Sequence, residues 1–283
     1  MSPPPEFGLA RVLPAENPPG LPEDVFILRL GYVPQKSADG GSKAALPLPG
    51  RFYMLRPEHS AVLLGRPISL FFAEQGGDSL VLEFLIGQKG AGTGELRSLP
   101  PGSGVVILGP LGNGFPPPGD ALPGAAGKKL LLIGGGLGIG PVAGFAGTLP
   151  DGAYDLWACF RSRPYGLHRV KPGALTVVTE DGSAGLRGAL GDALGPEILL
   201  GGGYTGVYAC GPEPMLAFVR DLCRRSALPC FLSMENRMAC GMGVCLGCVI
   251  RTTGGNRRCC ADGPVFSGEE LIFPQNPGGL QKP

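Results

Sequence analysis

The sequence predicts three folded units in one chain: an antiparallel β-barrel, an α/β unit built on a parallel sheet, and a small unit held together by cysteines. Residues 1–124 contain short apolar runs separated by turn residues, which is typical of antiparallel strands. In residues 125–229 strand-like runs alternate with helical segments, which is the order of a parallel sheet covered by helices. Residues 230–283 are too few for a large core, so we expect a metal group to cross-link them.

The apolar runs of the first unit predict its strands, and their spacing fits a barrel or a sandwich. They occupy residues 25–28, 52–55, 68–72, 80–84 and 105–108. A proline- and glycine-rich stretch at residues 116–127 has the composition of a loop between domains.

The second unit alternates between segments with the two-residue period of strands and segments with the period of helices. Strands are expected at residues 129–133, 154–160, 175–178 and 207–210, and helices at residues 141–149 and 214–226. This βαβ order predicts a nucleotide-binding type of parallel sheet, whose ligands lie at the carboxyl ends of the strands.

The overall composition excludes several classes of partner. The chain has 283 residues, with 24 Lys and Arg against 23 Asp and Glu, and no basic block, so neither nucleic acid nor a membrane surface is the expected main partner. The apolar stretch at residues 130–149 is interrupted by glycines and a proline, which favours a strand, loop and helix over a membrane span. The N-terminus has no signal-peptide pattern, so we expect a cytoplasmic protein.

Three cysteines of the last unit have the spacing of plant-type 2Fe-2S ferredoxins. Cys240, Cys245 and Cys248 form C-x4-C-x2-C, and in that pattern the fourth thiolate comes from a more distant cysteine, here Cys259 or Cys260. The glycines between them allow a short loop to wrap a cluster and to direct backbone N–H groups at its sulfurs. The spacing therefore predicts a 2Fe-2S cluster.

Other uses of the cysteines fit less well. A structural zinc site usually has two C-x2-C-like hooks, whereas the first spacing here is longer and rich in glycine. Nine cysteines is an odd number, and without an export signal a disulfide framework is not expected. Cys159, Cys223 and Cys230 are expected to be buried free thiols.

Two segments of the first unit indicate a flavin site. Arg66-Pro67-Ile68-Ser69 begins a strand, where the guanidinium can pair with a phosphate. The glycine loop that contains Gly92 and Thr93 can hold a pyrophosphate, with Thr93 as the N-cap of the next helix. Together they predict a site for a dinucleotide flavin. The alternative is two ordinary barrel turns with an exposed arginine, which would have the same sequence pattern.

A glycine-rich turn after the first strand of the second unit indicates a second nucleotide. This turn does not match G-x-G-x-x-G, because Pro141 stands where the third glycine would be. The backbone of this turn can still approach a pyrophosphate closely. The alternative to a nucleotide site is a glycine turn that is merely flexible. The glycines assigned to the nicotinamide nucleotide are Gly134, Gly135, Gly136 and Gly138.

A further strand of the second unit ends in Cys210-Gly211-Pro212. This places a polarisable thiol at the carboxyl edge of the sheet, so Cys210 is a candidate catalytic residue, and a buried structural cysteine is the alternative. Arg161 and Arg163 follow another strand and leave the choice between NAD and NADP open.

The order of these segments resembles the ferredoxin reductase superfamily. Residues 235–248, ENRMACGMGVCLGC, followed by residues 260–266, CADGPVF, resemble the electron-transfer subunit of class 1B dihydroorotate dehydrogenase. The resemblance implies that Cys260 and not Cys259 is the fourth cluster ligand. It also implies FAD bound by Arg66 to Ser69, by Gly92 and Thr93, and by the strand end Leu85, Ile86 and Gly87.

The family resemblance also implies a function. The family's partner is an FMN-containing dihydroorotate dehydrogenase catalytic subunit of pyrimidine biosynthesis, in a hetero-oligomer with two copies of each chain. Electrons are expected to cross the cluster singly, to pair on FAD and to leave as a hydride to NAD, because a flavin links one-electron and two-electron transfer. The chain's own histidines, His59 and His168, lie in no acid–base constellation.

Two other functions fit parts of the pattern. A related reductase subunit, such as a component of a sulfide dehydrogenase or of an NADPH-ferredoxin oxidoreductase, would share all three cofactor regions. A zinc-stabilised, non-catalytic binding protein would give a colourless preparation.

Overall fold

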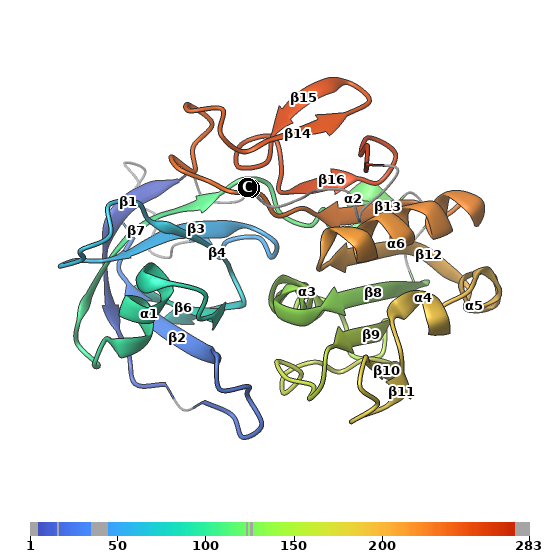
Figure 1. Cartoon of the computed structure of the whole chain (residues 1–283), viewed down its shortest axis with the longest axis horizontal. Coiled ribbons are helices and arrows are strands. Elements are labelled where there is room, and N and C mark those ends of the chain that lie inside the picture. The colour runs from blue at the N-terminus through green and yellow to red at the C-terminus, as the bar shows by residue number, and fades with distance from the viewer. Residues whose placement is uncertain (1–4, 16, 35–44, 123, 125–126, 275–283) are drawn as a thin grey trace.

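The computed structural model describes residues 5–15, 17–34, 45–122, 124 and 127–274. The barrel and the α/β unit lie side by side, and the cysteine-bearing segment lies across the top of both (Figure 1). No helix within the described ranges is long and apolar enough to cross a membrane.

The first unit is an antiparallel sheet of seven strands that closes on itself. Its order is β4-β3-β7-β1-β2-β6-β5, and the two end strands β4 and β5 are consecutive in the chain. Leu70 and Phe71 join them, and their amide N–H groups donate to the carbonyls of Arg51 and Glu83, both at 2.9 Å. The strands are β1 (Glu6–Val12), β2 (Val25–Tyr32), β3 (Phe52–Pro57), β4 (Arg66–Ser69), β5 (Phe72–Gly76), β6 (Ser79–Gly87) and β7 (Gly104–Leu111).

The predicted barrel is confirmed, with two differences in its strands. β1 is not predicted by the sequence patterns, because Gly8 and charged residues interrupt its apolar side chains. The single strand expected at residues 68–72 is wrong: this run spans the end of β4, the two crossing residues and the start of β5. The crossing is apolar because Leu70 and Phe71 are both buried.

The second unit is a sheet of seven strands in the order β11-β10-β9-β8-β12-β13-β16, parallel except for its last pair. The predicted parallel sheet is therefore confirmed. Its strands are β8 (Lys129–Gly135), β9 (Tyr154–Phe160), β10 (Ala174–Thr179), β11 (Leu186–Arg187), β12 (Tyr204–Cys210), β13 (Cys230–Ser233) and β16 (Val265–Ser267). Its helices are α3 (Ile139–Ala146), α4 (Leu190–Ala193), α5 (Pro196–Gly201) and α6 (Glu213–Arg225), with a 3-10 turn at Gly136–Gly138.

The cysteine-bearing segment shares the second sheet. β13 pairs with β12, and β16 returns from the cysteine region to pair with β13, so these two strands belong to the α/β sheet although they follow residue 229. Within the described part of this segment, the hairpin of β14 (Val249–Thr252) and β15 (Gly255–Arg258) alone forms a separate sheet. Residue 125, the expected start of the second unit, lies outside the described residues, and α2 (Pro118–Ala121) precedes it.

A continuous apolar interface joins the barrel to the α/β unit. One core cluster contains Phe71 and Leu85 of the barrel together with Ile139 and Phe145 of α3. The helix approaches so closely that a Cβ built at Gly144 would overlap the carbonyl oxygen of Phe71. The same interface carries an ionic contact, since Arg169 pairs with Glu74 at 2.8 Å and with Glu83 at 3.1 Å.

The close approach at Gly144 generates a prediction about stability. Gly144→Ala should lower the free energy of unfolding by about 1–3 kcal/mol, because the added methyl group forces α3 away from the barrel. Thermal or urea unfolding measures this loss. In the same helix a Cβ at Gly140 meets no atom closer than 3.6 Å, so Gly140→Ala serves as the control and should be neutral or slightly stabilising. Equal losses in both variants would contradict the assignment of Gly144.

Candidate functional site

The structure brings the four predicted cluster cysteines together as two pairs. The backbone N–H of Cys245 points at the sulfur of Cys240 at 3.5 Å, and the N–H of Cys260 points at the sulfur of Cys248 at 3.4 Å. The thiols within each pair also contact each other. Within the described ranges no three His, Cys, Asp or Glu side chains are arranged to hold a single metal ion. A 2Fe-2S cluster needs a different arrangement, with two thiolates on each of two irons, and the paired cysteines fit it.

The loop between Cys240 and Cys245 is shaped to stabilise a thiolate. Burial raises the pKa of Cys240, but the N–H groups of Cys245, Met242 and Val244 together with the Cys245 thiol outweigh this and lower the pKa to about 6. Donors aimed at sulfur stabilise the anionic form that binds iron. The loop therefore presents a preformed half of a cluster site.

Cys259 and Cys260 are adjacent in sequence but point to different partners. The Cys259 thiol is buried and donates to the carbonyl of Met234 at 3.3 Å. The Cys260 thiol lies against Cys248 and accepts the N–H of Gly243. Burial raises the pKa of both thiols to about 12, so iron binding at Cys260 would displace a proton. Of the two cysteines, the geometry favours Cys260 as a ligand.

The cysteine cage is packed against the wall of the barrel. Cys248, Cys259 and Cys260 share a buried cluster with Met54 and Leu111 of β3 and β7. The contact is tight, because a Cβ at Gly241 would lie 2.6 Å from Cγ of Met54. The opposite side of the cage is open, since Cys245 is exposed.

The predicted flavin residues meet at the start of α1 (Ala91–Ser98). The Arg66 side chain lies over this helix end, and a Cβ at Gly92 would be 2.8 Å from its Nε atom. That Nε is buried and has no hydrogen-bond partner among the residues that the structure describes. A buried, unpaired guanidinium donor beside a helix N-terminus is suited to a phosphate, so the residues fit the pyrophosphate of FAD.

Thr93 has a different position from the one expected. The N-cap residue of α1 is Gly90, so the prediction of Thr93 as N-cap is wrong. Thr93 is the third helical residue, and its hydroxyl folds back to accept the N–H groups of Lys89 at 2.9 Å and Gly90 at 3.3 Å. The threonine thereby fixes the loop instead of starting the helix.

The other predicted flavin residues lie beside the predicted nicotinamide nucleotide site. Pro67, Ile68 and Ser69 are half-buried along β4, and Leu85 and Ile86 are buried at the end of β6. Gly87 ends that strand, and a Cβ there would lie 2.7 Å from Leu137 of the glycine-rich turn. The flavin strand end and the nucleotide turn are therefore neighbours.

The predicted nucleotide residues come together where β8 and β12 end. A Cβ at Gly135 would lie 2.9 Å from Pro212, and one at Gly138 would overlap the backbone carbonyl of Cys210. A Cβ at Gly211 would lie 3.1 Å from Cα of Gly135. Side chains on these glycines would fill the edge where open α/β sheets bind nucleotides. The two remaining glycines, Gly134 and Gly136, belong to β8 and to the turn that follows it.

Cys210 is a buried thiol. Its side chain is only 2% exposed, and it pairs in the sheet with Gly134 and Ser233. Burial raises its pKa to about 12, and the nearby Glu235 adds to this. The thiol is therefore neutral near pH 7, which suits packing or a weak hydrogen bond better than nucleophilic attack.

Sequence reasoning missed a residue that fixes the cage to the barrel. The amide of Asn113, just after β7, donates to the carbonyl of Val265 at 2.7 Å and accepts the N–H of Val265 at 2.9 Å. It also donates to the carbonyl of Asp262 at 3.3 Å. No local motif marks this residue, because its partners lie about 150 positions later in the chain.

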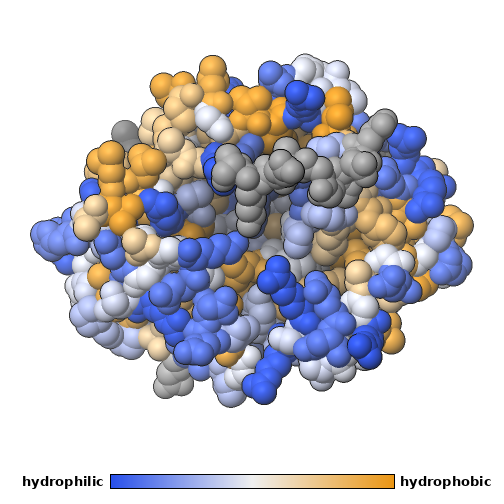
Figure 2. Space-filling model, in the orientation of Figure 1, coloured by the Kyte–Doolittle hydropathy of each residue, from blue (hydrophilic) through white to orange (hydrophobic). Residues whose placement is uncertain are grey.

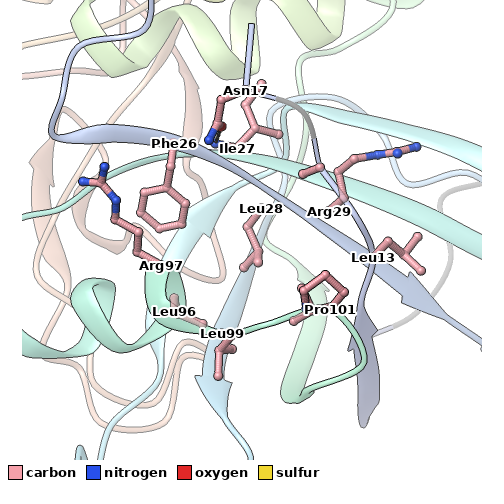
Figure 3. A pocket seen from close by; sticks show the side chains of 12 residues that line it. Leu13, Asn17, Phe26, Ile27, Leu28, Arg29, Leu96, Arg97, Leu99 and Pro101 are labelled. Carbon is pink, nitrogen blue, oxygen red and sulfur yellow. Dashed lines mark hydrogen bonds between the residues drawn. The ribbon is translucent and has the colours of Figure 1, made fainter.

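A separate cavity of about 220 Å³ lies on the barrel between the β1–β2 connection and the C-terminal end of α1 (Figure 3). Its two guanidinium groups are already engaged: Arg97 donates to Gln88 at 2.9 Å, and Arg29 pairs with Glu83 at 2.9 Å. None of the predicted site residues lines it. We therefore assign no role in electron transfer to this cavity.

Comparison with known proteins connects the site to one family. Residues 235–272 match the family model of the iron-sulfur cluster binding domain of dihydroorotate dehydrogenase B. The electron transfer subunit of dihydroorotate dehydrogenase B (NAD(+)) from Clostridium acetobutylicum is 38% identical over 227 residues, which cover 80% of this chain and 86% of that protein. The subunit of the same name from Clostridium perfringens is 35% identical over 230 residues, covering 79% and 87%.

Solved structures agree on the fold. The NADH-dependent reduced ferredoxin-NADP oxidoreductase structure has a TM-score of 0.68 at 22% identity and covers 94% of this chain and 90% of its own. A ferredoxin NADP+ reductase from Neisseria gonorrhoeae with bound FAD and NADP has a TM-score of 0.52 at 18% identity, covering 82% and 94%. The fold is thus that of ferredoxin reductases with a cysteine-bearing segment added. By its similarity over most of its length, the chain belongs to the family of dihydroorotate dehydrogenase B electron transfer subunits.

Proposed function

We propose that this chain carries electrons between a dihydroorotate-oxidising catalytic subunit and NAD through a 2Fe-2S cluster and FAD. One observation carries the proposal: a paired-cysteine cage, a flavin cradle and a nucleotide turn lie on contiguous parts of one chain whose relatives are electron transfer subunits. When bound, FAD links two-electron exchange with nicotinamide to one-electron exchange with the cluster. The protein's part is to hold these groups in contact and away from water.

The four paired cysteines are the proposed cluster ligands. Cys240 and Cys245 would hold one iron, and Cys248 and Cys260 the other, because each pair shares a short N–H to sulfur contact. Cys259 would remain a protonated thiol that donates a hydrogen bond to the carbonyl of Met234.

The flavin would be held from three directions. Arg66 would direct its unpaired Nε at the pyrophosphate over the N-terminus of α1, where Gly92 leaves room and Thr93 fixes the loop. The backbone of Pro67, Ile68 and Ser69 and the strand end Leu85, Ile86 and Gly87 would line the isoalloxazine side.

The nicotinamide nucleotide would lie across the ends of β8 and β12. Gly134, Gly135, Gly136 and Gly138 would approach its pyrophosphate, and Gly211 and Pro212 would bound the nicotinamide side. Cys210 would pack beside the nicotinamide as a neutral thiol. We take the nucleotide to be NAD, because the Clostridium relatives are subunits of dihydroorotate dehydrogenase B (NAD(+)).

The open side of the cage is the proposed contact with the catalytic subunit. Met242, Val244 and Leu246 surround Cys245 and are 51%, 76% and 61% exposed. Figure 2 shows hydrophobic surface at the upper left, where the cysteine loop meets the barrel. Exposed apolar side chains that gather at one place mark a protein-binding surface. An FMN-containing partner, two copies of each chain and a cytoplasmic location complete the proposal.

Affinity purification tests the identity of the proposed partner. Affinity purification of the tagged chain from its source cell should bring down an FMN protein that oxidises dihydroorotate with NAD only when this chain is present. A partner that instead reduces sulfur, or that works only with NADP, would overturn the assignment. A colourless chain without iron or flavin would support the zinc-stabilised alternative.

A charge on the proposed contact surface should uncouple the two subunits. Val244→Asp should lower dihydroorotate–NAD turnover roughly tenfold or more, because burying an unpaired carboxylate in an interface costs at least about 1.4 kcal/mol. NADH-dependent reduction of a soluble dye by the same variant should be unchanged. Leu200→Asp, at a leucine on α5 that is 66% exposed, is the control and should leave both activities intact.

Neighbouring cysteines provide a matched test of the cluster ligands. Cys260→Ser should lose the visible absorbance of the cluster and its EPR signal after reduction, because serine is a poor replacement for thiolate on iron. Cys259→Ser should keep both, since a hydroxyl can still donate to Met234. The reverse pattern would make Cys259 the fourth ligand.

Removing the guanidinium of Arg66 should release FAD. Arg66→Gln should weaken FAD binding about 10- to 100-fold, the effect of losing a charge-assisted hydrogen bond worth about 1.5–3 kcal/mol. Isothermal calorimetry or flavin fluorescence measures this on the apo-flavin protein. Arg97→Gln, at the other end of the same helix, should bind FAD normally, and unchanged binding in Arg66→Gln would remove Arg66 from the site.

A further inference from the structure

Arg258 connects the two halves of the cysteine cage. It ends β15, two residues before Cys260, and its side chain forms a two-pronged ion pair with Asp262, with Nε 3.0 Å and Nη2 2.8 Å from the two carboxylate oxygens. Its third nitrogen, Nη1, donates to the carbonyl of Gly243 at 3.3 Å. Gly243 belongs to the other half, in the loop between Cys240 and Cys245.

The peptide that Arg258 contacts also faces the sulfurs. The carbonyl of Gly243 and the N–H of Val244 belong to the same peptide group, and that N–H points at the sulfur of Cys240. A cation on the carbonyl polarises the peptide and strengthens the N–H to sulfur hydrogen bond at its other end. Arg258 thus acts on Cys240 through one intervening amide.

The guanidinium also lies close to the second pair. Its charge interacts with both Cys248 and Cys260, and a Cβ at Gly243 would be 3.1 Å from its Nη1 atom. The Arg258 side chain is partly exposed, so water reduces the effect of its charge, and the carboxylate of Asp262 offsets part of the remainder. Arg258 and Asp262 therefore place opposite charges beside the cysteine cage.

We propose that Arg258 and Asp262 act as positioning residues that set the reduction potential of the cluster, with the arginine raising it and the aspartate lowering it. The inference rests on the proposed function, because it assumes the cluster in this cage. Reduction adds one negative charge to the site, so a nearby cation and strengthened N–H donors stabilise the reduced form more than the oxidised form. A nearby anion has the opposite effect.

A purely structural role for this ion pair makes a different prediction. If the pair only braced the loop, removal of either partner would loosen the cage in the same way, and both variants would shift the potential in one direction. If charge dominates, the two variants shift it in opposite directions. The sign of the two shifts therefore separates the two roles without any measurement of turnover.

The test is an EPR-monitored redox titration of the full-length chain after anaerobic reconstitution with iron and sulfide. Arg258→Gln should move the midpoint potential to more negative values, and Asp262→Asn should move it to more positive values. Arg258→Lys keeps the charge but loses the two-pronged geometry, so its shift should be smaller than that of Arg258→Gln. Arg251→Gln, an exposed arginine on the same hairpin, is the matched control and should titrate like the unaltered chain.

Each outcome has a distinct meaning. Shifts of the same sign in Arg258→Gln and Asp262→Asn, or a shift in Arg251→Gln as large as that in Arg258→Gln, would overturn the inference. If Arg258→Gln fails to assemble a cluster, the signs for Arg258→Lys and Asp262→Asn still decide it. Absence of a cluster in the unaltered chain would instead refute the proposed function.

Discussion

The cysteine-bearing segment depends on packing against the other two units, because its buried apolar side chains lie in core clusters that it shares with them. Its cysteines Cys248, Cys259 and Cys260 share one buried cluster with Met54 and Leu111 of the barrel, and Gly241 lets the loop approach that wall. Asn113 forms two hydrogen bonds with Val265 of its return strand and one with Asp262 in the preceding turn. The barrel thus determines the position of the cage. It thereby also determines the distance from the cysteine sulfurs to the flavin cradle, which lies on the same barrel.

The same dependence links the nucleotide turn to the flavin. The α/β unit contacts the barrel through α3 and through Leu137, which covers the strand end at Gly87. The interface is apolar and continuous, so the two units form one body rather than two tethered domains. A relay benefits from such rigidity, since electron and hydride transfer require donor and acceptor to be held at fixed separation.

Sequence patterns predicted the local features well and the long-range ones poorly. Strand periodicity, the cysteine spacing and the glycine turns are local, and the barrel, the parallel sheet and the paired cage follow from them. β1 escaped prediction because its apolar residues are interrupted, and the role of Thr93 depended on how its side chain turns back on the loop. The contacts of Asn113 and of Arg258 join residues whose proximity only the folded chain determines.

The pairing of β16 with β13 has a consequence beyond the cage. A parallel sheet that ended at β13 would leave a row of unpaired N–H and C=O groups, which can recruit strands from other molecules. β16 runs antiparallel along that edge at residues 265–267, directly after the last cysteine turn. β16 becomes the edge in place of β13, and an edge strand of only three residues offers few such groups. The segment that carries the redox site therefore also limits strand recruitment at this end of the sheet.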